Sequence, residues 1–426
     1  MTRGRNLIVL VTAIVAAIAA IVLFAASAAA RHSASTSSRT VTTTTSDTRA
    51  RQLAREQAAV AAASVGLRPG AVSPSTAGVA AAAATLPKLT TTQLAGQRVI
   101  YSYSGLNPPA QLLNLIRHGE VAGVVFFAGN VGSKAHLAAV AAELQKAAAA
   151  KTDPVRLPLL LMTDQEGGQV RRLPGEPVLS AKQVGEAAHP WRAATAAGKG
   201  AGQNLRGVGL NVNLAPVLDI YRKAGNFIDE FGRSFSSNAG KVAKLGALYA
   251  QAEQQQRVAA TVKHFPGLGA AATSQNTDER PVTLKLPLSV IRGTDELPYK
   301  AAITAKAKVV MVSWAIYPAL DAKNPAGLSS VIVQDELRKR LGFAGVTMTD
   351  ALGAGALGPF GSIAHRATLA ARAGMDLLLC SEGKYTEGTA AMNSIAYDYT
   401  HHSLNAADFK AAVMRVLALR ATLAGK

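Results

Sequence analysis

The stretch VAATVKHFPGLG, residues 258–269, joins an apolar run to a pair of titratable side chains. The run VAATV is apolar or β-branched, which is typical of a strand buried on both faces of a parallel sheet. Lys263 and His264 follow where this run stops, shortly before a Pro-Gly turn. In barrels of parallel strands, the active-site residues lie at the carboxyl ends of the strands. The stretch therefore predicts a buried strand that presents two titratable groups to a site.

The same rhythm of short apolar runs and longer amphipathic stretches recurs along the chain, as expected of strands that alternate with helices. We predict eight strands, at residues 98–103, 122–129, 157–164, 209–217, 258–265, 308–315, 345–350 and 375–380. A doubly wound fold would show a glycine fingerprint after its first strand, and none is present. We therefore predict the α/β class, with a single (β/α)8 TIM barrel in residues 86–426 and a last helix within residues 405–426.

Residues 6–30 carry no charge and are long enough to span a bilayer as a helix. Arg3 and Arg5 precede this run, which places the N-terminus in the cytoplasm. Because AASAAA also offers small residues for cleavage, residues 1–30 are either a transmembrane anchor or a signal peptide. We expect residues 31–85 to be a disordered spacer rich in Ser, Thr and Ala. Both alternatives place the barrel outside the cytoplasm, on the cell membrane or secreted.

The composition excludes several classes of site. The formal net charge is +19, yet no dense block of Lys and Arg with interleaved aromatic residues indicates a nucleic-acid groove. The positive charge fits either contact with anionic envelope polymers or simple solubility. Cys380 is the only cysteine, so we expect no disulfide within the chain and a buried, unreactive thiol. No His, Asp or Glu spacing indicates a metal site, and we expect no cofactor.

Polar residues stand at or just beyond the ends of several predicted strands. They are Asp164, Asp219, Arg233, Lys263, His264 and Asp350. Taken singly, each has a structural explanation, because an aspartate can cap a helix and Lys263 and His264 can be an ion pair and a packed ring. Their convergence on one rim instead favours a site for a polyhydroxylated ligand, since carboxylates and guanidinium groups make bidentate hydrogen bonds with neighbouring hydroxyls.

Five segments together resemble the N-terminal barrel of the family 3 glycoside hydrolases. They are MTDQEGGQVRRL (162–173), NLAPVLD (213–219), GRSF (232–235), KHFPGLG (263–269) and GFAGVTMTDALGAGAL (342–357). The resemblance extends over about residues 90–426 and is nearest to the single-domain bacterial β-N-acetylhexosaminidases that trim peptidoglycan fragments. It implies an exo-acting, retaining glycosidase of the cell envelope, which cleaves a terminal β-linked N-acetylglucosamine or a related β-glycoside from a carbohydrate of cell-wall origin.

The resemblance also implies a role for individual residues. Asp350 matches the catalytic nucleophile, whose carboxylate forms a covalent glycosyl–enzyme ester. The positions that hold the terminal sugar by its hydroxyls match Asp164, Arg172, Arg233, Lys263 and His264.

The chain departs from the family where the proton donor is expected. Single-domain relatives supply an Asp-x-His pair after PGHG, whereas this chain reads PGLG with Leu268, and no such pair follows within residues 274–277. We therefore predict that Asp278 is the acid/base, with Glu279 as a weaker candidate, because these are the only carboxyls on the loop. A second departure is Trp314, where the family often has histidine.

Three alternatives stay open at this point. A barrel that kept the sugar subsite and lost the proton shuttle is a silent sugar-binding module outside the membrane. A β-glucosidase would use the same nucleophile on a different sugar. A scaffold that holds a partner near the wall is the third, although no partner motif supports it. The sequence carries no feature that sets an oligomeric state.

Overall fold

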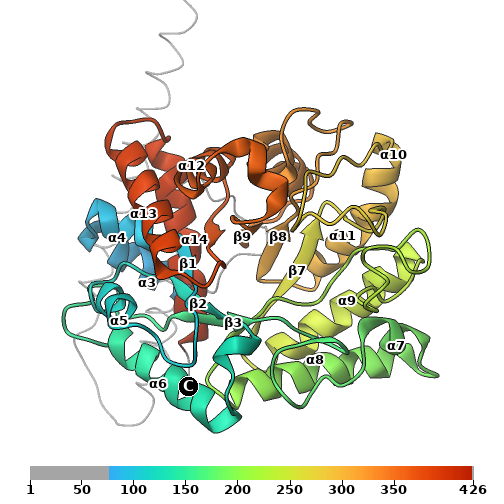
Figure 1. The fold of residues 1–426 in the computed structure, drawn as a ribbon, viewed down its shortest axis with the longest axis horizontal. Coiled ribbons are helices and arrows are strands. Elements are labelled where there is room, and N and C mark those ends of the chain that lie inside the picture. The colour runs from blue at the N-terminus through green and yellow to red at the C-terminus, as the bar shows by residue number, and fades with distance from the viewer. Residues whose placement is uncertain (1–75, 425–426) are drawn as a thin grey trace, which may run out of the picture. The chain divides into compact units, whose positions relative to one another are not determined.

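The computed structural model describes residues 76–424, and in this part of the chain eight parallel strands form a closed barrel. Figure 1 shows these strands in the middle of the molecule, with helices around them. The strands are β1 (Val99–Tyr101), β2 (Gly123–Phe126), β3 (Leu160–Thr163), β6 (Val212–Asn213), β7 (Ala259–Phe265), β8 (Val309–Val312), β9 (Val346–Ala351) and β10 (Leu377–Leu379). Each predicted strand range overlaps one of them, so the predicted (β/α)8 barrel is confirmed.

The strands join in the spatial order β1-β10-β9-β8-β7-β6-β3-β2, and every pairing between them is parallel. Two more strands, β4 (Gln165–Gly167) and β5 (Val170–Arg171), form an antiparallel hairpin directly after β3. This hairpin was not predicted from the sequence. It lies outside the barrel wall and bears on the site described below.

Helical segments connect the strands. The α-helices are α3 (Thr76–Thr85), α4 (Thr91–Gly96), α5 (Ala110–Arg117), α6 (Lys134–Ala148), α7 (Ala181–Glu186), α8 (Pro190–Arg206), α9 (Ala239–Gln254), α10 (Leu288–Val290), α11 (Leu297–Thr304), α12 (Ile363–Ala373), α13 (Tyr385–Thr400) and α14 (Ala406–Leu423). Shorter or differently wound segments are η1 (Leu86–Lys88), η2 (Ala128–Asn130), η3 (Ile291–Asp295), η4 (Ala326–Leu328), η5 (Val331–Arg340) and η6 (Gly355–Phe360).

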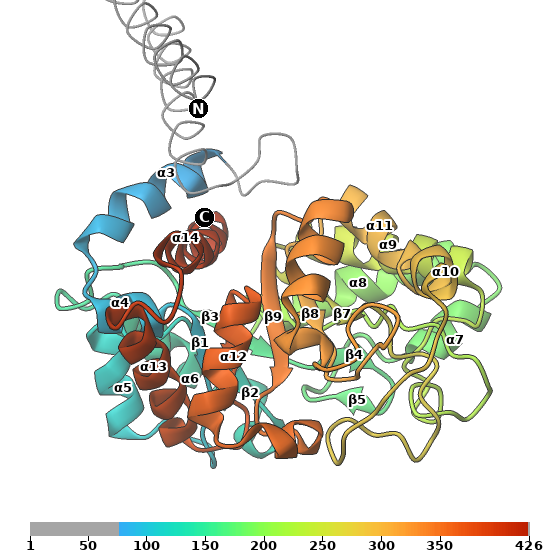
Figure 2. The ribbon, with the colours of Figure 1, turned by 90° about the horizontal axis from the view of Figure 1, so that it is seen from above.

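The helix α14 closes the amino-terminal end of the barrel and confirms the predicted last helix. Val416 and Leu419 belong to the apolar cluster that fills the barrel, together with Ile100 of β1 and Leu377 of β10. Arg420 donates to the backbone carbonyl of Leu157, just before β3. Figure 2 shows α14 at one end of the strands and the hairpin of β4 and β5 toward the other. The site must therefore open at the carboxyl end.

The helix α3 falls within the segment that we expected to be a disordered spacer. Its Val79 and Ala82 are buried, and it packs against α14. The alanine run therefore forms part of the packed structure, in keeping with the high helix propensity of alanine. The rest of the predicted spacer and the predicted anchor or signal peptide lie outside the described residues. Within residues 76–424, no helix is both long and apolar enough to cross a membrane.

An ion cluster around a fully buried carboxylate joins α14 to the barrel wall. The carboxylate of Asp376, just before β10, lies 2.7 Å from both Arg338 of η5 and Arg415 of α14. Burial opposes ionisation, but the two guanidinium groups hold the pKa of Asp376 below its usual value. The backbone amide of Thr347 also donates to this carboxylate. The cluster thus ties η5, β9, β10 and α14 together.

We expect Asp376→Asn to lower the free energy of unfolding by about 3–5 kcal/mol at neutral pH, because it leaves two buried cations without their counter-charge. The folded-state pKa is depressed, so this contribution is present above the ordinary aspartate pKa and is lost as the pH falls through the folded value. Urea unfolding at neutral and acidic pH measures both effects. The control is Asp335→Asn in the exposed pair with Lys339, where a change below about 0.5 kcal/mol is expected. A similarly small loss in Asp376→Asn would contradict the prediction.

Candidate active site

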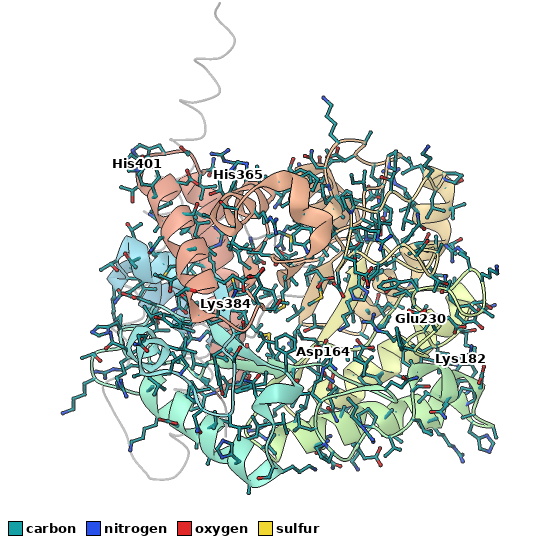
Figure 3. All side chains as sticks on the ribbon, viewed as in Figure 1. Asp164, Lys182, Glu230, His365, Lys384 and His401 are labelled. Carbon is teal, nitrogen blue, oxygen red and sulfur yellow. The ribbon has the colours of Figure 1, made fainter. Side chains whose placement is uncertain are left out.

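A cavity of about 480 Å³ opens at the carboxyl ends of the strands. Its floor is apolar and is formed by Leu214, Met311 and Leu379, which belong to the cluster that fills the barrel. Figure 3 shows Asp164, which lines the cavity, near the middle of the view and away from the surface residues Lys182 and His401 at its edges. The cavity walls include seven of the predicted site residues, Asp164, Arg172, Arg233, Lys263, His264, Asp278 and Asp350.

An ion network around Glu166 builds one wall of the cavity. Glu166, on β4, lies 2.8 Å from the ammonium group of Lys263, and Arg233 donates to both of its carboxylate oxygens at 2.9 and 2.8 Å. Lys263 also donates to Asp164 at 2.8 Å. Burial opposes ionisation of Glu166, yet the charges of Arg233 and Lys263 lower its pKa. The wall therefore presents ionised carboxylates and charged donors in fixed positions.

His264 is oriented by a buried carboxylate. Its Nδ1 lies 2.6 Å from Oδ2 of Asp219, which is fully buried at the end of the segment after β6. The other oxygen of Asp219 accepts a hydrogen bond of 2.6 Å from the backbone amide of Leu268. Because Nδ1 is occupied, Nε2 is the ring nitrogen left for a ligand. Leu268, at the position where the family resemblance led us to expect histidine, is a buried apolar part of the cavity wall.

Arg172 reaches the cavity from the end of the hairpin. The hairpin is held at its base by Gln165, whose side chain accepts from and donates to the backbone of Leu173, each at 3.0 Å. The backbone amide of Arg172 donates to the carbonyl of Asp164 at 3.3 Å. Among the described residues, the buried Nε of Arg172 has no hydrogen-bond partner. The residue itself lines the cavity, so the guanidinium lies beside the space that a ligand would occupy.

Asp350 lies at the end of β9, and the backbone around it is held by Trp314. The amide of Ala351 donates to Oδ1 of Asp350 at 2.8 Å, and the indole Nε1 of Trp314 donates to the carbonyl of Ala351 at 2.8 Å. The indole is only 1% exposed and packs on Gly327, where a Cβ atom would come within 2.5 Å of the ring. Trp314 does not line the cavity. It supports the peptide that carries Asp350.

Asp278 faces the same cavity from the loop after β7. This loop is joined to the loop after β9, because the amide of Gly355 donates to the carbonyl of Asp278 at 2.7 Å. The side chain of Asp278 stands at the exposed rim, and the cavity walls still remove part of its water. This partial burial, and then the charge of Asp350, raise the pKa of Asp278 against the opposing charges of His264, Arg233 and Lys263.

Glu279 is placed differently from Asp278. Its side chain is 58% exposed, pairs with Arg280 at 3.1 Å and accepts from Asn276 at 3.1 Å. It does not line the cavity. The geometry therefore favours Asp278 over Glu279 as the proton donor.

The cavity also has polar and aromatic residues that the sequence reasoning missed. Among them are Glu166, Phe227, Phe231 and Glu382. Glu382 lies three residues after the end of β10, so a search for polar residues just beyond the strand ends would have found it. Glu166 depends on the hairpin, which returns its side chain to the site. Cys380 is buried and free, as predicted. Within residues 76–424, no group of His, Cys, Asp and Glu side chains could hold a metal ion.

Comparison with known proteins identifies related sequences. Residues 88–419 match the family model of the glycosyl hydrolase family 3 N-terminal domain. A protein of Arthroderma benhamiae described as an "uncharacterized secreted glycosyl hydrolase" is 46% identical over 329 residues, which are 77% of this chain and 93% of that protein. A β-hexosaminidase of Xanthomonas euvesicatoria pv. vesicatoria is 33% identical over 288 residues, which are 66% of this chain and 82% of that enzyme.

Two solved structures share the fold. A family 3 β-N-acetylglucosaminidase from Paenibacillus sp. has a TM-score of 0.74 and 34% identity, over 79% of this chain and 64% of that one. A β-N-acetylhexosaminidase from Beutenbergia cavernae has a TM-score of 0.70 and 31% identity, over 78% of this chain and 98% of that one. This chain thus spans nearly the whole Beutenbergia enzyme but less than two thirds of the Paenibacillus enzyme.

We expect Trp314→Phe to lower kcat on an aryl β-glycoside about fivefold while KM changes less than twofold. The reason is that one hydrogen bond, worth about 1 kcal/mol, is lost from the peptide beside Asp350. Thermal unfolding measured in parallel separates this effect from general loss of fold. The control is Trp191→Phe, at an indole that is 42% exposed and lies outside the cavity. It should change neither kcat nor the unfolding temperature. A Trp314→Phe chain with reduced stability and an unchanged kcat would show a purely structural role.

Proposed function

The chain belongs to glycosyl hydrolase family 3 and is a glycosidase that hydrolyses O-glycosyl compounds, and we propose that it is an exo-acting, retaining β-N-acetylhexosaminidase of the cell envelope. The observation that carries this proposal is the cavity in which Asp350 and Asp278 share one space with a wall of charged hydrogen-bonding groups. The relatives named β-hexosaminidase and β-N-acetylglucosaminidase favour N-acetylglucosamine over glucose as the sugar.

Asp350 and Asp278 have complementary roles in the proposed reaction. The carboxylate of Asp350 attacks the anomeric carbon and forms a glycosyl–enzyme ester while Asp278 gives its proton to the departing glycosidic oxygen. Asp278 then takes a proton from water, whose oxygen attacks the anomeric carbon and releases Asp350. Burial, and then the charge of Asp350, raise the pKa of Asp278, which supports Asp278 as the group that donates the proton.

The sugar-binding groups surround the space above the apolar floor. Lys263, Arg233 and Asp164 are held by the network at Glu166. The Nε2 atom of His264 is left for a sugar hydroxyl, and Arg172 lines the same space. The barrel core closes the cavity from below, so a polymer cannot pass through it. This closed base supports removal of a terminal sugar. A silent sugar-binding barrel would not require the carboxyl pair that the cavity retains.

We further propose that the enzyme works outside the cytoplasm on carbohydrate derived from the cell wall. The apolar run at residues 6–30 supports either a membrane anchor or a cleaved signal, and the Arthroderma relative is described as secreted. The catalytic domain is proposed to occupy residues 86–426, with α3 packed against it.

The proposed activity is tested with the full chain and the p-nitrophenyl derivatives of β-N-acetylglucosamine and β-glucose. We expect turnover with preference for the N-acetylglucosaminide, and a loss on the order of 10⁴-fold in Asp350→Ala, because the nucleophile is removed. Asp335→Ala, at an exposed carboxylate, is the control and should keep full activity. Preference for the glucoside would instead make the protein a β-glucosidase, and no turnover of either substrate would reject the proposal.

The proton donor is tested by varying the leaving group. Asp278→Asn should lower kcat/KM for methyl β-N-acetylglucosaminide by about 10²–10⁴-fold and for the p-nitrophenyl substrate far less, since p-nitrophenolate leaves without protonation. A general acid must be protonated, so wild-type activity should fall as pH rises through the raised pKa of Asp278, and this fall should disappear in the variant. Glu279→Gln is the matched control. Full activity of Asp278→Asn on the methyl glycoside, with a loss in Glu279→Gln, would reverse the assignment.

A further inference from the structure

Phe231 is an exposed aromatic residue at the mouth of the cavity. Its side chain is 45% exposed, and among the large exposed apolar side chains of residues 76–424 it alone lines the cavity. The sugar-binding wall described above is built from charged groups. The exposed phenyl ring beside this wall instead offers a ligand an apolar, aromatic surface.

A hydrogen-bonded turn holds Phe231 in place. The carboxylate of Asp229 accepts from the amide of Gly225 and from Lys182, both at 2.8 Å, and its backbone carbonyl accepts from the amide of Gly232 at 2.8 Å. Lys182 in turn donates its backbone amide to the carbonyl of Gly232 at 3.0 Å. Figure 3 shows Lys182 and Glu230 near one another toward the edge of the molecule, where this turn lies. The ring therefore belongs to a preorganised surface.

The turn is attached to the loop that carries Asp278. Asn226 donates to the carbonyl of Gly269 at 2.8 Å, and Thr273 donates its hydroxyl to the carbonyl of Gly225 at 2.9 Å. Phe227, which is largely buried, lines the cavity from the same segment. The two phenyl rings and the proposed proton donor thus come from neighbouring segments. Because the donor must contact the glycosidic oxygen, the group that departs with this oxygen lies on the same side of the cavity.

We propose that Phe231 forms the binding surface for the leaving-group sugar, a pyranose ring that is β-linked to the terminal residue. This inference rests on the proposed function. One face of a pyranose ring presents C–H groups, which can pack flat on a phenyl ring, while its hydroxyls point outward to water. Phenylalanine has no polar group of its own, so it recognises the ring face without requiring one pattern of hydroxyls.

The inference is tested by measuring how tightly sugars bind to a variant that cannot hydrolyse them. In an Asp350→Asn background, calorimetry compares β-1,4-linked N-acetylglucosamine disaccharide with methyl β-N-acetylglucosaminide, which lacks the second ring. We expect the disaccharide to bind about 5- to 10-fold more tightly, as one aromatic contact allows. Adding Phe231→Ala should abolish this advantage and leave the affinity for the methyl glycoside within twofold. Phe231→Tyr should keep the advantage, and Trp191→Ala, an exposed aromatic outside the cavity, should change nothing.

Either of two results would overturn the inference. Phe231→Ala could weaken both ligands equally, which would place the ring at the terminal sugar or in the fold, or it could leave the advantage of the disaccharide intact. Failure of the proposed function is a separate observation, because it appears as absence of turnover in the wild-type chain with the p-nitrophenyl substrates. The binding comparison remains decisive in that case, since it needs no catalysis.

Discussion

The ion network around the buried carboxylate of Glu166 is the interaction on which the proposed sugar-binding wall depends. A carboxylate removed from water is costly unless cations and hydrogen bonds compensate it. Here both are supplied, since Arg233 binds both oxygens of Glu166 and Lys263 lies 2.8 Å from one of them. Lys263 lies in β7 and Arg233 in the connection between β6 and α9, and the two cations would repel each other without this anion. Glu166 thus holds them side by side and still leaves part of their donor capacity for a ligand.

A second constraint places the two proposed catalytic carboxyls together. The loop after β7 and the loop after β9 are joined through backbone hydrogen bonds from Gly355 to Asp278 and from Ala356 to Thr277. A side chain at position 355 would collide with the carbonyl of Glu279, 2.1 Å from where its Cβ would lie, so glycine allows this close approach. The position of Asp278 is therefore determined by the backbone. This arrangement offers a physical route by which a chain without the Asp-x-His pair keeps a carboxyl near Asp350.

The barrel was predictable because strands buried on both faces leave a strong pattern. Each of the eight is a short apolar run such as that at 258–262, and helices separate them. The search for polar residues at the ends of the predicted strands identified Asp164, Lys263, His264 and Asp350, and all four line the cavity. Glu166 was not predicted because it lies beyond the end of β3. Its side chain reaches the cavity only through the hairpin of β4 and β5, which the sequence analysis did not predict. The helix α3 was misjudged because its alanine run has no polar face that would distinguish a packed helix from a spacer.

The change from charged groups deep in the cavity to an aromatic ring at its mouth follows from how water affects each interaction. Lys263 and Glu166 are almost fully buried, and there a charged hydrogen bond meets little competition from solvent. At the mouth, where Phe231 is 45% exposed, water would weaken the same ion pairs until they contributed little. Contact between apolar surfaces does not depend on a low dielectric, because it gains from the water that it displaces. An enzyme that binds one sugar inside and a second outside is therefore expected to use charge for the first and an aromatic face for the second.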